Sequence, residues 1–532
     1  MALKPVTSRV SQATAAAVEV KRGLIDTLKP PPAKAPAPSA FSAAQGPDTR
    51  PRAPWSGRAQ VLASRALEAA KGTTGDAAIR KAVEALATDP SIAGASLSVS
   101  VAALHGGPVI AARGASDDLN PASNSKLATA SFAMAVLGAD HRFETPFQLD
   151  GAGRLCVVGN FDPSLTPARL LDAARALKAS GVHTLAGVTL DNSALEGTRT
   201  PAHFAEAGDA DWEFLAPPEA LSVDKNLVWL EVTPGEREGE AGRIRVDQGA
   251  FEIRDGVTTL PGGSEFHLRV DEQDVHGTLV RNAKGQAIID VTGDIASSYT
   301  KGKALKMKSP DPVASFADKL LAALQQAGIE VKGPVLSGKA PADARTVFTS
   351  RSAPLAELLK ASIAESNAFD HEMYALAAAR AQRGSPTISL EQATAELGTF
   401  LHREVGLESF RFDNASGIGN ANRLSSDDVL KILRKDAQDP RFRPIFDGLA
   451  RPGQPGSTLG TRMLGTPAEG SLRAKTGTLG RIVALSGVVG FDGPRPLGFS
   501  VLLNGLEKGA PGRETGRAFV DAMGIVLATL NA

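Results

Sequence analysis

The distribution of apolar residues predicts three strands and a final helix near the C-terminus. Segments 471–479, 482–491 and 497–504 are short and rich in Val, Leu and Ile, and glycine-containing turns separate them. Such short connections favour antiparallel neighbours. Residues 514–530 then carry apolar side chains at helical spacing, namely Phe519, Val520, Met523, Val526, Leu527 and Leu530. We therefore expect a small antiparallel sheet with a helix packed against it.

A buried helix is predicted over 127–137. This stretch is apolar on nearly every face, and a helix of that kind lies inside a protein. Pro121 just before it suits a first helical turn, where a missing N–H costs nothing, and Gly138 provides a stop. Apolar spacing of the same kind predicts further helices over 167–180 and 315–327.

Residues 234–293 follow a different pattern, in which polar and apolar positions alternate. Gly242-Arg-Ile-Arg-Val246 and His267-Leu-Arg-Val270 are examples. A period of two is typical of strands with one buried face. This part of the chain is therefore expected to form a small β-rich module.

The N-terminal residues differ in composition from the rest of the chain. Many prolines between 30 and 54, together with Ala and Ser, are typical of a disordered linker. We expect 1–56 to be disordered and 1–54 to be dispensable for catalysis, because such a composition has no core to join. No secretory signal is recognisable, since charged residues interrupt the first segment, and no run is long enough to span a membrane.

Charge and cysteine content exclude several classes of function. Lys plus Arg and Asp plus Glu both number 58, so the net charge of zero gives no sign of nucleic-acid or membrane-surface binding. The single cysteine, Cys156, cannot form an internal disulfide and is expected to be a small buried residue. His371-Glu372 lacks a second histidine at metalloprotease spacing, so neither a metal nor a cofactor is expected.

Ser123-Asn-Ser-Lys126 is the segment with the clearest chemical meaning. At the start of a buried helix, Lys126 lies one turn after Ser123 and on the same face. A desolvated lysine can act as the base that activates a serine, and the N–H groups of the helix start can stabilise an oxyanion. Ser222 and Ser298 open tetrads of the same form, but no buried helix follows either of them.

Two later segments complete a possible acyl-transfer site. Ser366-Asn-Ala368 is expected to break a helix over 354–362 from a second helix near Phe369. Lys475-Thr-Gly-Thr478 lies in a predicted edge strand, where the lysine and the threonine hydroxyls can bind a carboxylate. A glycine in such a strand lets the backbone approach a ligand closely. No phosphate-loop motif is present.

The three segments resemble the motif set of penicillin-interacting serine D,D-peptidases and serine β-lactamases. In order and spacing, the chain from about Ala77 to Ala532 resembles peptidase family S13, the D-alanyl-D-alanine carboxypeptidases/endopeptidases of penicillin-binding protein 4 type. The segments that carry this resemblance are Asn120–Leu127, Gly159–Leu165, Gly187–Ser193, Asp413–Ile418, Asn422-Arg423 and Ala474–Leu479.

The resemblance implies an α/β (α+β) fold with a β-lactamase/transpeptidase-like domain, whose antiparallel sheet is flanked by helices. It implies that this catalytic domain is discontinuous, 57–144 and 345–532. Inserted domains would occupy 145–344, between the first and second motifs, with the β-rich module nested at about 234–293.

The resemblance also implies a serine D,D-carboxypeptidase, with D,D-endopeptidase activity as an option, that acts on peptidoglycan stem peptides. Its catalytic residues would be Ser123, Lys126, Ser366 and Lys475, and its substrate-binding residues Asn367, Thr476, Gly477 and Thr478. β-Lactam antibiotics would be covalent inhibitors, and the cell envelope or periplasm the expected location. The sequence does not give the oligomeric state.

One position departs from the family pattern. Ala368 stands where the family has an asparagine that hydrogen-bonds the substrate amide, and Asn367 can substitute only if the loop shifts by one residue. Loss of one such bond is worth about 1–3 kcal/mol and weakens rather than abolishes catalysis. Two alternatives therefore stay open, a peptidoglycan-binding or scaffolding relative and an esterase or β-lactamase on the same fold.

Overall fold

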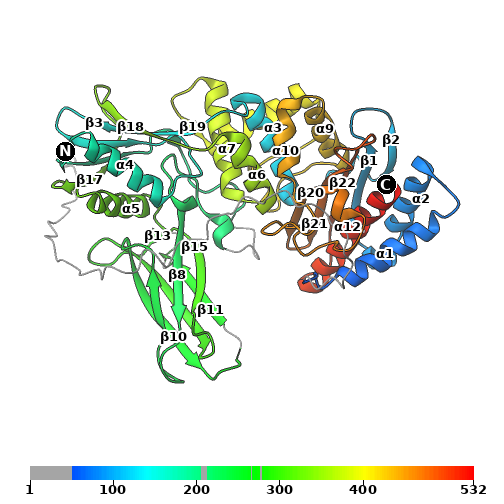
Figure 1. The fold of residues 1–532 in the computed structure, drawn as a ribbon, viewed down its shortest axis with the longest axis horizontal. Coiled ribbons are helices and arrows are strands. Elements are labelled where there is room, and N and C mark those ends of the chain that lie inside the picture. The colour runs from blue at the N-terminus through cyan, green and yellow to red at the C-terminus, as the bar shows by residue number, and fades with distance from the viewer. Residues whose placement is uncertain (1–50, 205–211, 265–266, 273, 276–277) are drawn as a thin grey trace, which may run out of the picture. The chain divides into compact units, whose positions relative to one another are not determined.

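An antiparallel sheet carries the last of the three motifs (Figure 1). The computed structural model describes residues 51–204, 212–264, 267–272, 274–275 and 278–532, all within one compact unit, 48–532. The sheet has the strand order β2-β1-β22-β21-β20. Its strands are β1 (Ser96–Ala103), β2 (Val109–Arg113), β20 (Leu472–Leu479), β21 (Ile482–Val489) and β22 (Leu497–Asn504). The three predicted C-terminal strands are confirmed, and β20 is an edge strand as expected.

Helices cover both faces of this sheet, and β21 is therefore buried at every position. One face packs against α1 (Ser56–Ala69), α2 (Gly75–Ala87) and α12 (Ala510–Leu530). The other face packs against α9 (Ser426–Ala437) and a helical cluster. That cluster contains α3 (Ser125–Leu137), α6 (Leu355–Glu365), α7 (Ala368–Arg383), α8 (Leu390–Phe400) and α10 (Arg443–Gly448). The predicted buried helix, the C-terminal helix and the break between α6 and α7 are all confirmed.

A second five-stranded sheet has the order β17-β6-β4-β3-β18. Its strands are β3 (Glu144–Leu149), β4 (Arg154–Val158), β6 (Gly187–Asp191), β17 (Val335–Ser337) and β18 (Arg345–Arg351). Helices α4 (Pro167–Ala179) and α5 (Pro312–Gln326) pack in its apolar core. They correspond to the helices predicted over 167–180 and 315–327. Because β18 pairs with β3, the chain leaves this sheet at residue 351 rather than at the predicted boundary of 344.

The β-rich module consists of two three-stranded sheets, β15-β8-β9 and β10-β14-β11. Their strands are β8 (Leu227–Thr233), β9 (Arg243–Val246), β10 (Phe251–Leu260), β11 (His267–Glu272), β14 (Ala287–Ala296) and β15 (Lys303–Lys308). Val228, Leu230 and Val232 of β8 point into a core shared with β10 and β14. Alternation thus predicted the type of structure correctly, but the strands extend beyond 234–293 on both sides.

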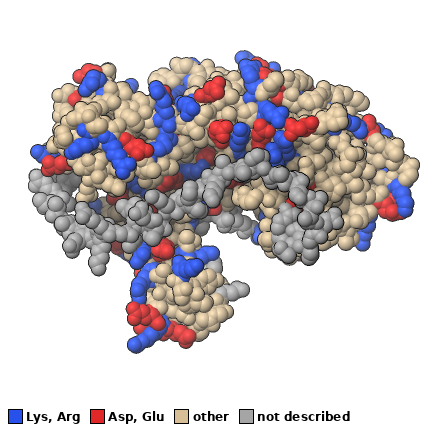
Figure 2. Space-filling model, viewed as in Figure 1, with Lys and Arg blue, Asp and Glu red and all other residues tan. Residues whose placement is uncertain are grey.

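The remaining elements are short. They are β5 (Thr184–Leu185) with β16 (Glu330–Val331), β7 (Leu195–Glu196) with β19 (Ile388–Ser389), β12 (Asp274–Val275) with β13 (Thr278–Leu279), and α11 (Ala468–Ser471). Acidic and basic side chains are intermixed on the face of the molecule in Figure 2. No helix among the described residues is long and apolar enough to cross a membrane.

The expected fold class is confirmed, with one correction at the N-terminus. Most of the predicted disordered segment, 1–50, lies outside the described residues. Ala53 is buried, its N–H donates to the Thr461 carbonyl at 2.8 Å, and α1 already begins at Ser56. The prediction that disorder reaches residue 56 is therefore wrong, since Ala53 and Trp55, on either side of Pro54, pack on the rest of the chain. The division into catalytic and inserted domains stays a prediction.

Candidate active site

Ser123 lies in a tight turn that leads into α3. The turn, Ala122–Asn124, is a single 3-10 turn, and α3 continues it from Ser125. Ala122 has a φ of 47°, which is a strained value for a residue other than glycine. Asn120 holds this conformation, because its Oδ1 accepts from the Ala122 N–H at 2.8 Å and its Nδ2 donates to the Gly419 carbonyl at 3.0 Å. The turn is thus fixed from both sides.

Lys126 is aimed at Ser123. Its Nζ lies 2.9 Å from the Ser123 Oγ and 2.6 Å from the Ser416 carbonyl oxygen, and the residue is only 1% exposed. Burial lowers the pKa of Lys126 from 10.5 to about 7, and the nearby charge of Glu372 offsets this only in part. A substantial fraction of neutral amine therefore exists near neutral pH, and that form can accept the serine proton.

Lys475 and Ser366 form a second pair of the same kind. The Lys475 Nζ donates to the Ser366 Oγ at 2.7 Å and to the Thr476 carbonyl at 2.8 Å, in a fully buried position. Burial lowers the pKa of Lys475 well below its usual value, and the charge of Lys126 lowers it further. Ser366 ends α6 with a left-handed φ of 63°, a conformation that directs the chain out of the helix. The site therefore holds two serine–lysine pairs that are electrostatically coupled.

A row of buried polar residues connects the sheet to the Ser123 turn. Lys475 pairs with Ser486 across β20 and β21, and Ser486 pairs with Ser500 on β22. The Ser486 Oγ accepts from Asn124 Nδ2 at 2.9 Å and lies 2.8 Å from the Ser500 Oγ. Lys475, Ser486 and Ser500 thus lie at one register position of the three neighbouring strands. The register of the sheet thus fixes the distance between the first and third motifs.

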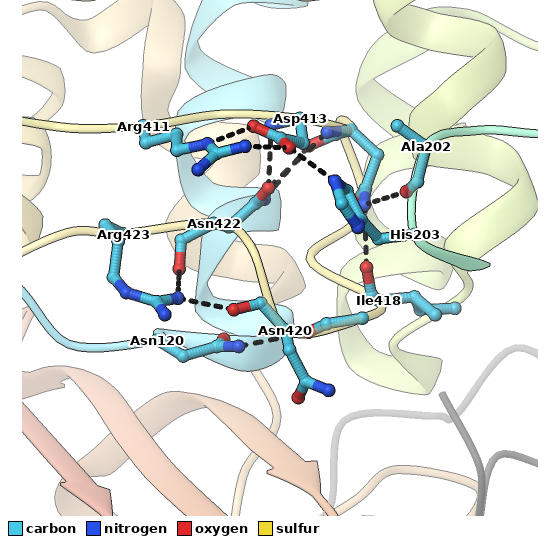
Figure 3. Close-up of polar contacts among 11 residues, drawn as sticks. Asn120, Ala202, His203, Arg411, Asp413, Ile418, Asn420, Asn422 and Arg423 are labelled. Carbon is cyan, nitrogen blue, oxygen red and sulfur yellow. Dashed lines mark hydrogen bonds and ion pairs between the residues drawn. The ribbon is translucent and has the colours of Figure 1, made fainter. Parts of the chain in front are cut away.

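The loop Arg411–Arg423 supplies the Ser416 carbonyl that contacts Lys126. Hydrogen bonds and ion pairs of this loop are drawn in Figure 3. Asp413 Oδ2 accepts from Arg411 Nη2 at 2.8 Å and lies 2.8 Å from His203 Nε2, and Asn422 Oδ1 accepts from the Asp413 N–H at 2.9 Å. Asn414 Nδ2 donates to the Ile418 carbonyl at 2.6 Å. Below this network, the Ser416 N–H donates to Glu372 at 2.8 Å. The loop therefore orients a carbonyl rather than a carboxylate toward the lysine.

Two glycines allow the three motif segments to approach one another. A Cβ on Gly417 would lie 2.0 Å from the Ala122 carbonyl oxygen, and a Cβ on Gly477 would lie 3.0 Å from that of Pro121. Larger residues would push the loop and β20 away from the Ser123 turn. The structure thus gives Gly477 a packing role, while its predicted contact with substrate stays a prediction.

One cavity of about 470 Å³ opens onto these groups, a volume suited to a small-molecule ligand. The sequence-predicted residues that line it are Ser123, Lys126, Ser366, Thr476 and Thr478. Lys475 is not among the residues that border the cavity, but its Nζ contacts the Ser366 Oγ. Five of the eight predicted residues therefore border one space, although they come from segments far apart in the chain.

The second motif lies at the predicted break between α6 and α7, and its three residues have different surroundings. Ala368 lines the cavity, whereas Asn367 caps α7, where its Oδ1 accepts from the Asp370 N–H at 3.1 Å. Asn367 is not among the residues that border the cavity. This geometry favours Ala368 as the position that faces a ligand, while the substrate-binding role of Asn367 stays a prediction.

The other two Ser-x-x-Lys tetrads lack this arrangement. Lys225 binds Asp370 at 2.5 Å, and the Ser222 Oγ accepts from Asn226 Nδ2 at 3.0 Å. Ser298 is exposed. The context of the helix, rather than the tetrad, was thus the informative signal.

Sequence reasoning missed several residues of the site. Glu372 and Ser416 support Lys126, and Ser486 supports the Ser123 turn. Trp55 and Arg517 border the same cavity. Ser416 lies in a segment that the family resemblance includes, but no local pattern marked the others. The described residues contain no cluster of three or more His, Cys, Asp or Glu side chains that could hold a metal ion.

Comparison with known proteins agrees with this geometry. The chain is 31% identical to the D-alanyl-D-alanine carboxypeptidase of Actinomadura sp. (strain R39), over 81% of this chain and 82% of that protein. It is 25% identical to the D-alanyl-D-alanine carboxypeptidase DacB of Haemophilus influenzae, over 75% and 83% of the two chains.

The fold agrees with that of a solved relative. The crystal structure of penicillin binding protein 4 from H. influenzae matches with a TM-score of 0.71 and 23% identity, covering 84% of this chain and 98% of that one. The sequence model of the D-Ala-D-Ala carboxypeptidase 3 (S13) family matches residues 79–527, a range that contains all three motifs. The chain belongs to this family of serine peptidases.

Proposed function

We propose that the protein is a serine D,D-carboxypeptidase that cleaves D-alanyl-D-alanine bonds of peptidoglycan stem peptides through an acyl-enzyme on Ser123. The observation that carries this proposal is the 2.9 Å contact between the Ser123 Oγ and the buried Lys126 Nζ, at the wall of a cavity. A lysine with a pKa of about 7 is suited to general-base catalysis near neutral pH.

In the first step, neutral Lys126 takes the Ser123 proton while the Ser123 oxygen attacks the carbonyl of the penultimate D-alanine. A bond forms between that oxygen and the carbonyl carbon, and the former carbonyl oxygen becomes an oxyanion. The N–H groups at the start of α3 favour negative charge here.

In the second step, the tetrahedral intermediate expels the terminal D-alanine. Lys475 and Ser366 pass a proton to its amine, in keeping with the 2.7 Å contact between them. The Thr476 and Thr478 hydroxyls, which border the cavity, bind its carboxylate. Water then hydrolyses the ester on Ser123 and restores the free serine.

The proposed reaction implies a class of inhibitor and a cellular location. A β-lactam presents a strained amide and a carboxylate in the arrangement that the site would recognise, so we propose that it acylates Ser123. Penicillin binding protein 4 from H. influenzae has been crystallised with a β-lactam. Because the proposed substrate is cell-wall peptide, we also propose that the protein acts in the bacterial cell envelope.

Release of D-alanine from a peptide ending in D-Ala-D-Ala tests the proposal. We expect turnover by the wild type and a loss of about a thousandfold or more in Ser123→Ala, because the nucleophile is gone. Ser222→Ala is the matched control, since its serine opens the same tetrad without a lysine contact, and it should keep full activity. Peptide binding without turnover by the wild type would favour the alternative suggested by Ala368, a catalytically weakened peptidoglycan-binding relative.

A further inference from the structure

The catalytic cavity extends beyond the motif residues. After Thr478, it is bordered by Leu479 and Gly480 at the end of β20. Its far wall comes from other segments that no motif includes, namely Trp55, Thr461, Arg462, Arg513 and Arg517. One continuous space therefore joins the reactive serine to a wall that contains three arginines and a tryptophan.

This wall has a built interior support. Asp521 on α12 is buried, accepts from Trp55 Nε1 at 2.7 Å, and accepts from Arg462 Nε at 3.0 Å. Arg517, one turn earlier on α12, lies over the Trp55 ring with its guanidinium 4.9 Å from the ring centre. Asp521 is thus occupied by Arg462 and Trp55, and the Trp55 ring packs against Arg517 at the cavity.

Of the arginines in this wall, Arg462 is ion-paired with Asp521, whereas Arg517 has a different environment. Arg517 forms no hydrogen bond or ion pair with another described residue. Burial lowers its pKa and the charges of Arg462 and Arg513 lower it further, while the charges of Asp521 and Glu514 offset this only in part. Arg513 and Arg517 also lie in the first two turns of α12, where the helix dipole disfavours cations. An anion placed against Arg517 would relieve both effects.

The position of the wall relates it to the leaving group. This step rests on the proposed function, in which Thr476 and Thr478 bind the carboxylate next to the released amine. Thr478 pairs with Val483 on β21, and a Cβ on Gly516 of α12 would lie 2.8 Å from Val483 Cγ2. The arginines of α12 therefore flank that end of β20, and we place them on the leaving-group side. A single D-alanine has no further group to reach it. A leaving group that is part of a second stem peptide carries an additional carboxylate.

We propose that Arg517, supported by Trp55 and Arg513, forms an anion subsite for a second carboxylate on the leaving group, and so favours cleavage of cross-linked peptides over release of single D-alanine. A planar guanidinium can bind a carboxylate through two parallel hydrogen bonds. Trp55 lies outside the range 79–527 that the family model matches. The subsite is therefore completed by a residue that the family model does not include.

Three substrates test the proposal with the full-length protein. They are a monomeric D-Ala-D-Ala peptide, a cross-linked peptide dimer whose leaving group has a free second carboxylate, and the same dimer with that carboxylate amidated. For the wild type, we expect amidation to lower kcat/KM about tenfold. Arg517→Gln should lower kcat/KM for the free-acid dimer by a similar factor and lower that for the amidated dimer far less, because the two changes remove the same interaction.

The controls separate this role from a structural one. Arg58→Gln removes a nearby arginine that hydrogen-bonds Thr515 but does not border the cavity, and it should keep the wild-type ratio of the two dimers. Arg513→Gln tests the same wall from a neighbouring turn if Arg517→Gln fails to fold. Penicillin acylation of each variant reports whether its catalytic centre is intact.

Two results would overturn the proposal while leaving the proposed function intact. They are a wild type that cleaves the free-acid and amidated dimers equally well, and an Arg517→Gln variant that loses the same factor on both. A wild type that cleaves none of the three substrates would overturn the subsite and the proposed function together.

Discussion

Two buried lysines in this molecule behave in opposite ways. Lys126 in the candidate active site and Lys319 on α5 are both almost inaccessible, with the Lys319 side chain 5% exposed. Burial lowers the pKa of each, but Lys319 lies 2.7 Å from Asp224 and 3.0 Å from Asp247, whose charges outweigh burial and raise its pKa. Lys126 contacts a hydroxyl and a carbonyl, and its pKa falls to about 7.

The difference shows that the choice of partner, rather than depth, decides whether a lysine becomes a base. Glu372 is the carboxylate whose charge acts on Lys126, but its Oε1 accepts a hydrogen bond from the Ser416 N–H at 2.8 Å. The lysine instead contacts the carbonyl of Ser416. A neutral acceptor orients the amine without stabilising its proton. The loop Arg411–Arg423 therefore keeps Lys126 reactive, while the α5 cluster keeps Lys319 charged and structural.

The largest expected effect comes from removing the two amines in turn. Lys126→Met should lower the rate of penicillin acylation about a thousandfold, because general-base assistance to Ser123 is lost. Lys319→Met should leave the acylation rate of the folded protein unchanged. Stopped-flow measurement of the acylation rate of both variants tests this contrast. Equal losses of rate would contradict the distinct role assigned to Lys126.

The second effect concerns stability rather than rate. Lys319→Met leaves two partly buried carboxylates, Asp224 and Asp247, without their counter-charge, so it should lower the free energy of unfolding by about 2–3 kcal/mol in urea titrations. Because its folded pKa is raised, the contribution of Lys319 is complete below pH 10.5 and is lost as the pH rises above that value. Lys332→Met is the control, since its contact with Glu330 is exposed and worth about 0–1 kcal/mol.

The pH dependence of acylation should be the third effect. The rate should rise as the pH rises through about 7, where Lys126 loses its proton, and should fall about tenfold per unit at lower pH. Since the charges of Lys126 and Lys475 interact, the apparent pKa of this pH profile describes the pair of lysines rather than one amine. A rate that stays flat between pH 5 and 7, in protein that remains folded, would contradict the neutral-lysine mechanism.

The smallest effect tests the departure at the second motif. Ala368→Asn places a donor at the cavity wall and should raise kcat/KM on a D-Ala-D-Ala peptide about tenfold, equivalent to roughly 1.4 kcal/mol. Asn367→Ala should cost a similar factor only if Asn367 already fills that role. Its position as the cap of α7 instead predicts a loss of about 1 kcal/mol in stability. If neither variant changes the rate, the loop is not the substrate-binding motif.

The candidate catalytic groups could be singled out from the sequence because their environment is local. Apolar residues around Leu127 predicted a buried helix, and the strand pattern around Lys475 predicted an edge strand. The supports of these groups were not predictable in the same way. Glu372, Ser416 and Ser486 gain their meaning from contacts across the fold, which no local periodicity records.

The N-terminal boundary failed for a related reason. Proline-rich composition distinguishes 1–50 from the rest of the chain, but it does not show that Ala53 and Trp55 pack against later segments. Trp55 packs on α12, a helix at the opposite end of the chain, and borders the catalytic cavity. A truncated protein that begins at Gly57 would therefore lose part of the cavity wall, whereas the dispensability of 1–54 stays a prediction.

Covalent labelling with a fluorescent penicillin, followed by mass spectrometry of the modified peptide, tests the central claim most directly. We expect one modified residue, Ser123, since it is the serine that Lys126 contacts at 2.9 Å. Labelling should disappear in Ser123→Ala and persist in Ser222→Ala and Ser298→Ala. Labelling that survives in Ser123→Ala, or that maps to a different serine, would contradict the assignment of the nucleophile.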